Sequence, residues 1–161
     1  MKKGETVYEA ADRLRLKYPR TDDLVLAMGR YMRAHARTVK NPVRPRSIIE
    51  SRFMPAAEAF RKGILSCGSM SNIATAMLRH LGFKVRLIHG EEADSVDHAW
   101  IAVYDLYSDS WKEYDLAKRL DGKVLDTHIK KAEVDSWEEI RGQIEEDHKT
   151  LQHRRAEKKK G

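Results

Sequence analysis

The stretch from residue 67 to residue 115 constrains the fold most, because one helical segment is followed there by three strand-like segments. Apolar residues recur at helical spacing after Cys67, and Gly82 is expected to end that helix. The strand-like segments are residues 85–89, 98–104 and 111–115. We therefore predict an α+β domain in which the helix packs on a small antiparallel sheet.

The flanking sequence is expected to add helices on both sides of this unit. We predict the limits of these helices from the spacing of apolar residues, from possible cap residues and from Pro or Gly breakers. The predicted helices cover residues 5–17, a segment capped by Thr21, a segment from Ser47 to Gly63 interrupted near Pro55, and residues 134–159. Val124 and Leu125 are predicted to add a short strand.

The length of 161 residues predicts one domain, which can bury a core without disulfides or a metal. We divide residues 1–161 into a helical N-terminal layer (1–46), a core that carries the candidate site (63–116) and a charged C-terminal helix with a basic tail (134–161). No stretch approaches the roughly 18 apolar residues of a membrane helix, and the first residues lack a signal-peptide core. We therefore expect a cytoplasmic protein without a membrane partner, in a reducing compartment that suits a free thiol.

Most of the formal net charge of +6 lies at the C-terminal end. Residues 148–161 hold six Lys and Arg against Glu157 alone, so the rest of the chain is nearly neutral. A basic tail can bind nucleic acid or an acidic partner, but a solvated helix end with cations near its C-terminus explains the same pattern. We favour the solvated helix end over nucleic acid, because no aromatic residue is interleaved with these charges.

Cys67 is the only cysteine, which rules out an intramolecular disulfide and a Cys-cluster zinc site. Cys67 opens the predicted helix, whose positive end favours a thiolate, and an ion pair with His98 would favour the thiolate further. A thiol, an imidazole and the carboxylate of Asp115 follow in the order of a nucleophile, its base and the orienter of that base. Each residue alone also fits a purely structural role.

The pairing of the last two strands follows from counting. If His98 lies directly opposite Asp115 in an antiparallel hairpin, Ala102 faces Trp111 and residues 105–108 form a four-residue loop. Opposed Cβ atoms lie about 4.5–5.5 Å apart, which allows the carboxylate to hold the imidazole. A slip of one residue would turn Asp115 to the other face.

Four motifs in this stretch together resemble the core of the transglutaminase-like superfamily. They are Cys67-Gly68-Ser69, the helix-to-strand passage from Leu78 to Gly90, the strand from His98 to Tyr104, and the strand from Trp111 to Asp115. The resemblance covers residues 63–116 and implies a papain-like scaffold. It further implies that Cys67 is the nucleophile, His98 the base and Asp115 the orienter.

This resemblance implies thiol-dependent acyl chemistry on a protein or peptide amide, by a cysteine peptidase or amidase or by a small acyltransferase. The backbone N–H of Cys67 is expected to donate to the oxyanion. Release of the acyl group to water or to an amine stays open, as do the substrate, the second oxyanion donor and the oligomeric state. Residues 1–46 and 121–161 match none of the family's motifs, so no substrate contacts are implied there. The alternatives are an arylamine-type acetyltransferase and a non-catalytic binding module whose basic tail recruits an acidic partner.

We expect no cofactor and no metal. His80, His89 and His98 with Asp94 and Asp97 fit no metal-binding motif, and the Asp-rich run of a calcium loop is absent from the sequence. Asp97 is interpreted instead as a solvated residue at the start of a strand.

The remaining polar and aromatic candidates receive structural interpretations. Trp100, Tyr104 and Trp111 are expected to pack in the core rather than to line a wall over the site. Residues 91–94 are read as an acidic surface loop, or alternatively as a rim that selects cationic substrates.

Overall fold

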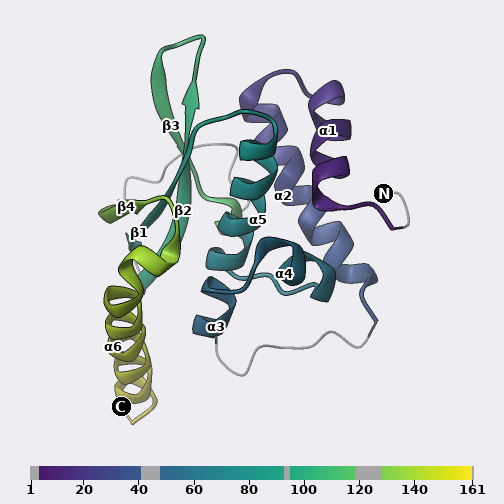
Figure 1. Ribbon diagram of the computed structural model, residues 1–161. Coiled ribbons are helices and arrows are strands. Elements are labelled where there is room, and N and C mark those ends of the chain that lie inside the picture. Colours follow the sequence, from purple (N-terminus) through teal and green to yellow (C-terminus); the bar gives the residue numbers. More distant parts are fainter. Residues whose placement is uncertain (1–3, 41–47, 93–94, 119–127, 161) are drawn as a thin grey trace.

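The computed structural model describes residues 4–40, 48–92, 95–118 and 128–160. Five helices lie on one side of a four-stranded sheet, and the last helix extends from one end of that sheet (Figure 1). The elements are α1 (Val7–Lys17), α2 (Thr21–Thr38), α3 (Ile48–Arg52), α4 (Ala56–Lys62), α5 (Cys67–His80), β1 (Val85–Glu92), β2 (Ser95–Asp105), β3 (Ser110–Tyr114), η1 (Leu116–Lys118), β4 (Ile129–Val134), η2 (Trp137–Ile140) and α6 (Arg141–Lys160). The predicted α+β architecture is confirmed.

The first two helices bury the apolar positions that the sequence spacing predicts. These positions are Val7, Ala10, Ala11 and Leu14 in α1 and Leu24, Met28, Tyr31 and Met32 in α2. Thr6 caps α1 through a reciprocal capping box with Glu9. Thr21 is the first helical residue of α2 and Arg20 occupies the cap position, so the prediction that Thr21 caps this helix is wrong.

The passage into α5 is set by two breakers and two serines. Pro55 separates α3 from α4, and Gly63 ends α4 with a φ of 68°, as the sequence predicts. Ser66 and Ser69 then satisfy each other's backbone N–H groups in a capping box, which fixes Cys67 as the first residue of α5. Ser47, the predicted start of the preceding helix, lies outside the described residues.

The sheet is antiparallel throughout, in the order β3-β2-β1-β4. Side chains of β2 alternate between its two faces, as predicted. Ala99, Ile101 and Val103 belong to the main core with α5, whereas Trp100 and Ala102 form a separate buried cluster with Ile88. The sheet therefore separates a helix-covered face from the face that carries Trp100.

The predicted register of β2 against β3 is wrong by two residues, since Ala102 pairs with Glu113 and not with Trp111. The connecting loop lies one residue later than predicted and ends at Asp109, whose φ of 50° is a left-handed conformation that Asp tolerates. A shift by two keeps every side chain on its predicted face, because the side-chain period of a strand is two.

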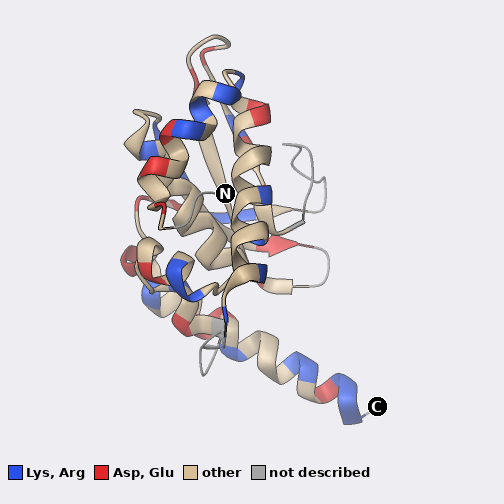
Figure 2. Cartoon of the chain, turned by 90° about the vertical axis from the view of Figure 1, so that its right-hand side faces the viewer, with Lys and Arg blue, Asp and Glu red and all other residues tan. Residues whose placement is uncertain are grey.

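The C-terminal part differs most from its prediction. Val134 belongs to β4, which the sequence reading missed, and the α-helix starts only at Arg141 after a short 3₁₀ turn. The predicted strand at Val124 and Leu125 lies outside the described residues. Figure 2 shows α6 leaving the body of the molecule with basic residues along its exposed end. Within the described residues, no helix is long and apolar enough to cross a membrane.

Of the three aromatic residues expected in the core, only Trp100 is fully buried, at 1% exposure. Trp111 is 47% exposed, so the prediction is wrong for this residue. Trp111 lies on the edge strand β3 and packs edge-on against Tyr104, with 5.5 Å between the ring centroids. The two rings cover each other near the hairpin end.

Candidate active site

The structure brings together the three residues that the sequence singled out. Cys67 is the first residue of α5, His98 lies in β2, and Asp115 directly follows β3. His98 Nε2 donates a hydrogen bond of 2.7 Å to Asp115 Oδ2, and both side chains are buried. Because Nε2 is engaged by the carboxylate, Nδ1 is the ring nitrogen that remains for Cys67.

His98 and Asp115 meet diagonally and not directly across the strands. Continuing the observed register places Asp115 opposite Trp100, two residues along β2 from His98. Diagonal neighbours on one face remain within reach of long side chains. The predicted contact therefore forms although the predicted direct opposition is wrong.

The charges around Cys67 favour a thiolate. Burial raises the pKa of the Cys67 thiol, but its hydrogen bond with His98 and the nearby Arg52 charge outweigh burial, so this pKa lies below its usual value. Burial lowers the pKa of His98, but the bonds to Asp115 and Cys67 outweigh it and raise this pKa to about 9. A thiolate beside an imidazolium is the favoured pair near neutral pH.

Asp115 also holds a second imidazole. His128 Nε2 donates to the same Oδ2 atom at 2.7 Å, and the His128 ring packs edge-on against Trp100 at 4.9 Å. Burial raises the pKa of Asp115, but the bonds from His98 and then His128 outweigh it, so this pKa lies below its usual value. The sequence reading missed His128, because no local motif distinguishes this histidine.

Arg52 is a further charged residue beside Cys67 that the sequence reading missed. Its guanidinium is buried, with Nη1 3.9 Å from Cys67 Sγ. Nη2 donates to His89 Nδ1 at 2.5 Å and lies 3.6 Å from Asp97 Oδ1. The guanidinium carbon lies 4.3 Å from the centroid of the Trp137 ring. Arg52 comes from α3, so only the tertiary fold places it here.

Asp97 is part of this buried network, so the interpretation of Asp97 as a solvated residue is wrong. Its side chain is 8% exposed, and its Oδ2 lies 3.2 Å from His148 Nδ1 of α6. His89 Nε2 donates to Asp147 Oδ2 of the same helix at 2.7 Å. Burial lowers the pKa of His89, which suits a neutral ring that accepts from Arg52 and donates to Asp147.

The transglutaminase-like superfamily core matches residues 23–116, which is more than half of the chain. The chain belongs to the transglutaminase-like superfamily. The match begins at residue 23, so it extends into the segment 1–46, where the motifs alone gave no likeness to the family. No curated protein and no solved structure matches the chain.

Papain-like cysteine chemistry is general in the transglutaminase-like superfamily. The α+β arrangement of helices on a small antiparallel sheet is the one expected for such a core. Helices α3 and α4 and all of α2 after its first two residues fall within the matched range, so Arg52 belongs to the family core and not to an added layer.

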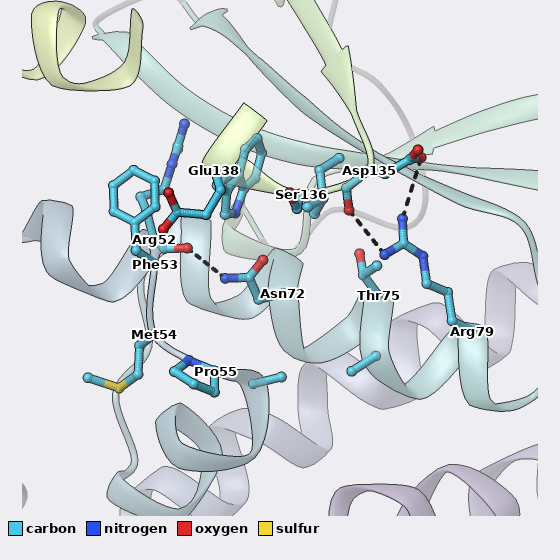
Figure 3. Close-up of a pocket in the computed structure, with 14 residues that line it drawn as sticks. Arg52, Phe53, Met54, Pro55, Asn72, Thr75, Arg79, Asp135, Ser136 and Glu138 are labelled. Carbon is cyan, nitrogen blue, oxygen red and sulfur yellow. Dashed lines mark hydrogen bonds and ion pairs between the residues drawn. The ribbon is translucent and has the colours of Figure 1, made fainter. Parts of the chain in front are cut away.

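A pocket of about 280 Å³ lies beside the candidate site of this transglutaminase-like core (Figure 3). Arg52 lines the pocket, together with Trp137 and Asn72, whereas Cys67, His98 and Asp115 are not among its lining residues. Asn72 donates to the Arg52 carbonyl at 2.8 Å, as the dashed line in Figure 3 marks. Arg52 therefore connects this pocket with Cys67.

Among the described residues, His98, Asp115 and His128 form the group whose ligand atoms are close enough to hold a metal ion, all within 4.8 Å. Tetrahedral zinc with bonds of 2.0–2.1 Å keeps its ligand atoms about 3.3 Å apart. The two 2.7 Å contacts to Asp115 are shorter and have the length of hydrogen bonds. In this structure Asp115 therefore accepts hydrogen bonds from both histidine rings.

The histidines that could be grouped into a metal site from the sequence lie in different places. His80 pairs with Asp12 at 3.0 Å, whereas His89 and Asp97 belong to the Arg52 network. Asp94 lies outside the described residues. Glu91 pairs with Lys131 at 3.3 Å and is part of β1, so it is not in a loop.

Proposed function

We propose that this protein performs thiol-dependent acyl chemistry on protein or peptide amides, with Cys67 as nucleophile, His98 as base and Asp115 as orienter. One observation carries the proposal. Asp115 holds His98 through Nε2, and His98 and Cys67 at the N-terminus of α5 shift each other's pKa, which leaves Nδ1 as the ring nitrogen to serve the thiol. This arrangement has the parts that an activated thiol nucleophile requires.

The reaction follows from these positions. The Cys67 thiolate attacks the carbonyl carbon, and the carbonyl electron pair moves to the oxygen. The His98 imidazolium gives its proton to the leaving amine as the carbon–nitrogen bond breaks, which leaves an acyl group on sulfur. His98 then accepts a proton from water or from an acceptor amine, which takes the acyl group and restores the thiolate. Water makes the protein a peptidase or amidase, and an amine makes it an acyltransferase.

The first test is the rate of Cys67 alkylation by iodoacetamide as a function of pH. The midpoint of the parent's rate profile is expected below pH 8.5, the ordinary thiol pKa, because its thiol pKa is lowered. His98→Ala is expected to move the profile up to the ordinary thiol value. His153→Ala is the matched control, since His153 is exposed on α6 and is expected to leave the profile unchanged.

The contrary result is a parent profile that rises only near pH 8.5 and does not respond to His98→Ala. That result would remove the activated pair and with it the proposal. A positive result leads to a screen of peptide amides with and without an added amine, with Cys67→Ala as the blank. Mass spectrometry of the products then separates hydrolysis from acyl transfer.

A further inference from the structure

We infer that Arg52 is a catalytic residue that donates a hydrogen bond to the oxyanion formed when Cys67 attacks a carbonyl. The inference rests on the proposed function and supplies the second oxyanion donor, alongside the backbone N–H of Cys67. Acyl transfer needs donors aimed at the oxygen on which charge develops, and removal of one donor typically costs a factor of about 10²–10³ in rate.

The path of the Arg52 side chain places its guanidinium at the start of α5. A Cβ on Gly68 would lie only 2.1 Å from Arg52 Cδ and 2.9 Å from Cγ, so the stem crosses the first turn of the helix where Gly68 leaves space. The N–H groups of Cys67 and Gly68 belong to this turn and have no intrahelical acceptor. Arg52 therefore joins the helix end at which an oxyanion bound to Cys67 would form.

Three contacts fix the guanidinium before any substrate arrives. Nη2 donates to His89 Nδ1 at 2.5 Å and lies 3.6 Å from Asp97 Oδ1, and the guanidinium carbon lies 4.3 Å from the centroid of the Trp137 ring. A donor that is already oriented needs no reorganisation during the reaction. The fixed position distinguishes Arg52 from a surface cation.

The guanidinium keeps donors available on the side of the thiol. Nη1 lies 3.9 Å from Cys67 Sγ, a weak contact in the resting state. Nε is buried and has no hydrogen-bond partner among the described residues. When the carbonyl carbon bonds to sulfur, the negative charge of the thiolate moves to the carbonyl oxygen. The Arg52 N–H groups near the sulfur would then donate hydrogen bonds to that oxygen.

Two reactions of the Cys67 thiolate distinguish hydrogen bonding of Arg52 to the oxyanion from a general effect of its positive charge on the thiolate. Iodoacetamide is displaced at carbon: the C–S bond forms, iodide leaves, and no oxyanion arises. p-Nitrophenyl acetate is attacked at its carbonyl: the C–S bond forms, the π pair moves to oxygen, and p-nitrophenolate leaves as the carbonyl re-forms. An oxyanion donor therefore accelerates the second reaction selectively.

The experiment compares both rates at pH 10, above the ordinary thiol pKa, in the parent and in Arg52→Gln. Arg52→Gln is expected to slow acylation, measured as the p-nitrophenolate burst, about 10²-fold more than alkylation. Arg52→Lys is expected to lose less, because it keeps a cationic donor. Arg86→Gln is the matched control, since Arg86 binds the Glu133 carbonyl and Asp135 and is expected to leave the ratio of the two rates unchanged.

Equal slowing of both reactions by Arg52→Gln would overturn the inference and leave the proposed function standing. A parent with no burst and an ordinary alkylation profile would overturn both. Since removal of Arg52 leaves Asp97 buried without its cation, far-ultraviolet circular dichroism checks that the variant folds. If it does not fold, Gly68→Ala carries the test, because it displaces the guanidinium but keeps its charge, and the same selective loss of acylation is expected.

Discussion

At the scale of single residues, a few buried polar groups carry the site, and each has several partners. Asp115 accepts from His98 and His128 on one oxygen, and Arg52 contacts Cys67, His89 and Asp97. Burial by itself favours the neutral form of a titratable group, so a buried charge depends on the neighbours that stabilise it. Changing one partner is therefore expected to change the protonation of the next.

Asp115→Asn tests this dependence between neighbours. The Asp115 carboxylate helps to raise the pKa of His98 to about 9. Without the carboxylate this pKa is expected to fall towards 6.5, so His98 loses its proton at a lower pH. The thiolate then loses its counter-ion, and the alkylation rate at pH 7.5 is expected to fall about tenfold, the effect of one pKa unit on ionisation. Asp135→Asn, which removes only exposed ion pairs, is the control. An unchanged profile in Asp115→Asn would show that Asp115 does not tune His98.

Gly68 and Gly142 offer a matched pair for a test of packing. A Cβ at Gly68 meets Arg52 at 2.1 Å, whereas a Cβ at Gly142 meets nothing within 4 Å. Gly68→Ala is expected to lower the free energy of unfolding by about 1–3 kcal/mol, the usual effect of overpacking. Gly142→Ala is expected to cause no loss, because alanine is the better helix former. Urea denaturation measures both, and equal stability of the two variants would contradict the assigned path of Arg52.

At the scale of elements, the start of α5 is where local sequence and function coincide. Ser66 and Ser69 cap the helix at the turn that presents Cys67, and Ser66 Oγ also lies 2.7 Å from Ser51 Oγ of α3. The same capping chemistry operates at α1 through Thr6, far along the chain from Cys67. The two helix starts therefore differ in what they position and not in how they are capped.

Ser66→Ala and Thr6→Ala separate stability from reactivity. Each is expected to lower the free energy of unfolding by about 1 kcal/mol, since each removes an N-cap hydrogen bond. Only Ser66→Ala is expected to slow Cys67 alkylation at neutral pH, because only this cap holds the turn that favours the thiolate. Urea denaturation and the iodoacetamide rate check the two variants. A slowed alkylation in Thr6→Ala would mean that global stability, and not the local turn, controls the thiol.

At the scale of the whole molecule, the first half of α6 packs against the sheet and supports the candidate site. Ile144, His148 and Leu151 are its buried residues, and its Asp147 and His148 bond to His89 and Asp97 from the sheet. The end of the helix from Gln152 on is exposed and basic. One half of α6 therefore supports the Arg52 network, while the other half faces solvent.

Two changes in α6 should have opposite outcomes. Ile144→Ala is expected to lower the free energy of unfolding by about 2–5 kcal/mol and to slow alkylation of Cys67, because the helix that carries Asp147 and His148 loosens. Residues 154–160 are exposed, so deletion of residues 154–161 is expected to change the free energy of unfolding by less than about 0.5 kcal/mol. Thermal unfolding should stay a single transition in the deletion, as one domain requires. A large loss of stability on deletion would contradict the exposed state of the tail.

The sequence by itself determined the helix at Cys67, the alternation of β2 and the shared face of His98 and Asp115, because these depend on local periodicity and on capping. Even the two-residue error in register preserved that face, since the period of a strand is two. Only the tertiary structure decided the places of Arg52, His128 and Asp97. The contacts of Arg52 and Asp97 join α3, α5, β1, β2 and α6, and His128 reaches Asp115 from the segment before β4. These elements are distant along the chain, and long-range packing leaves no local pattern from which such contacts could be read.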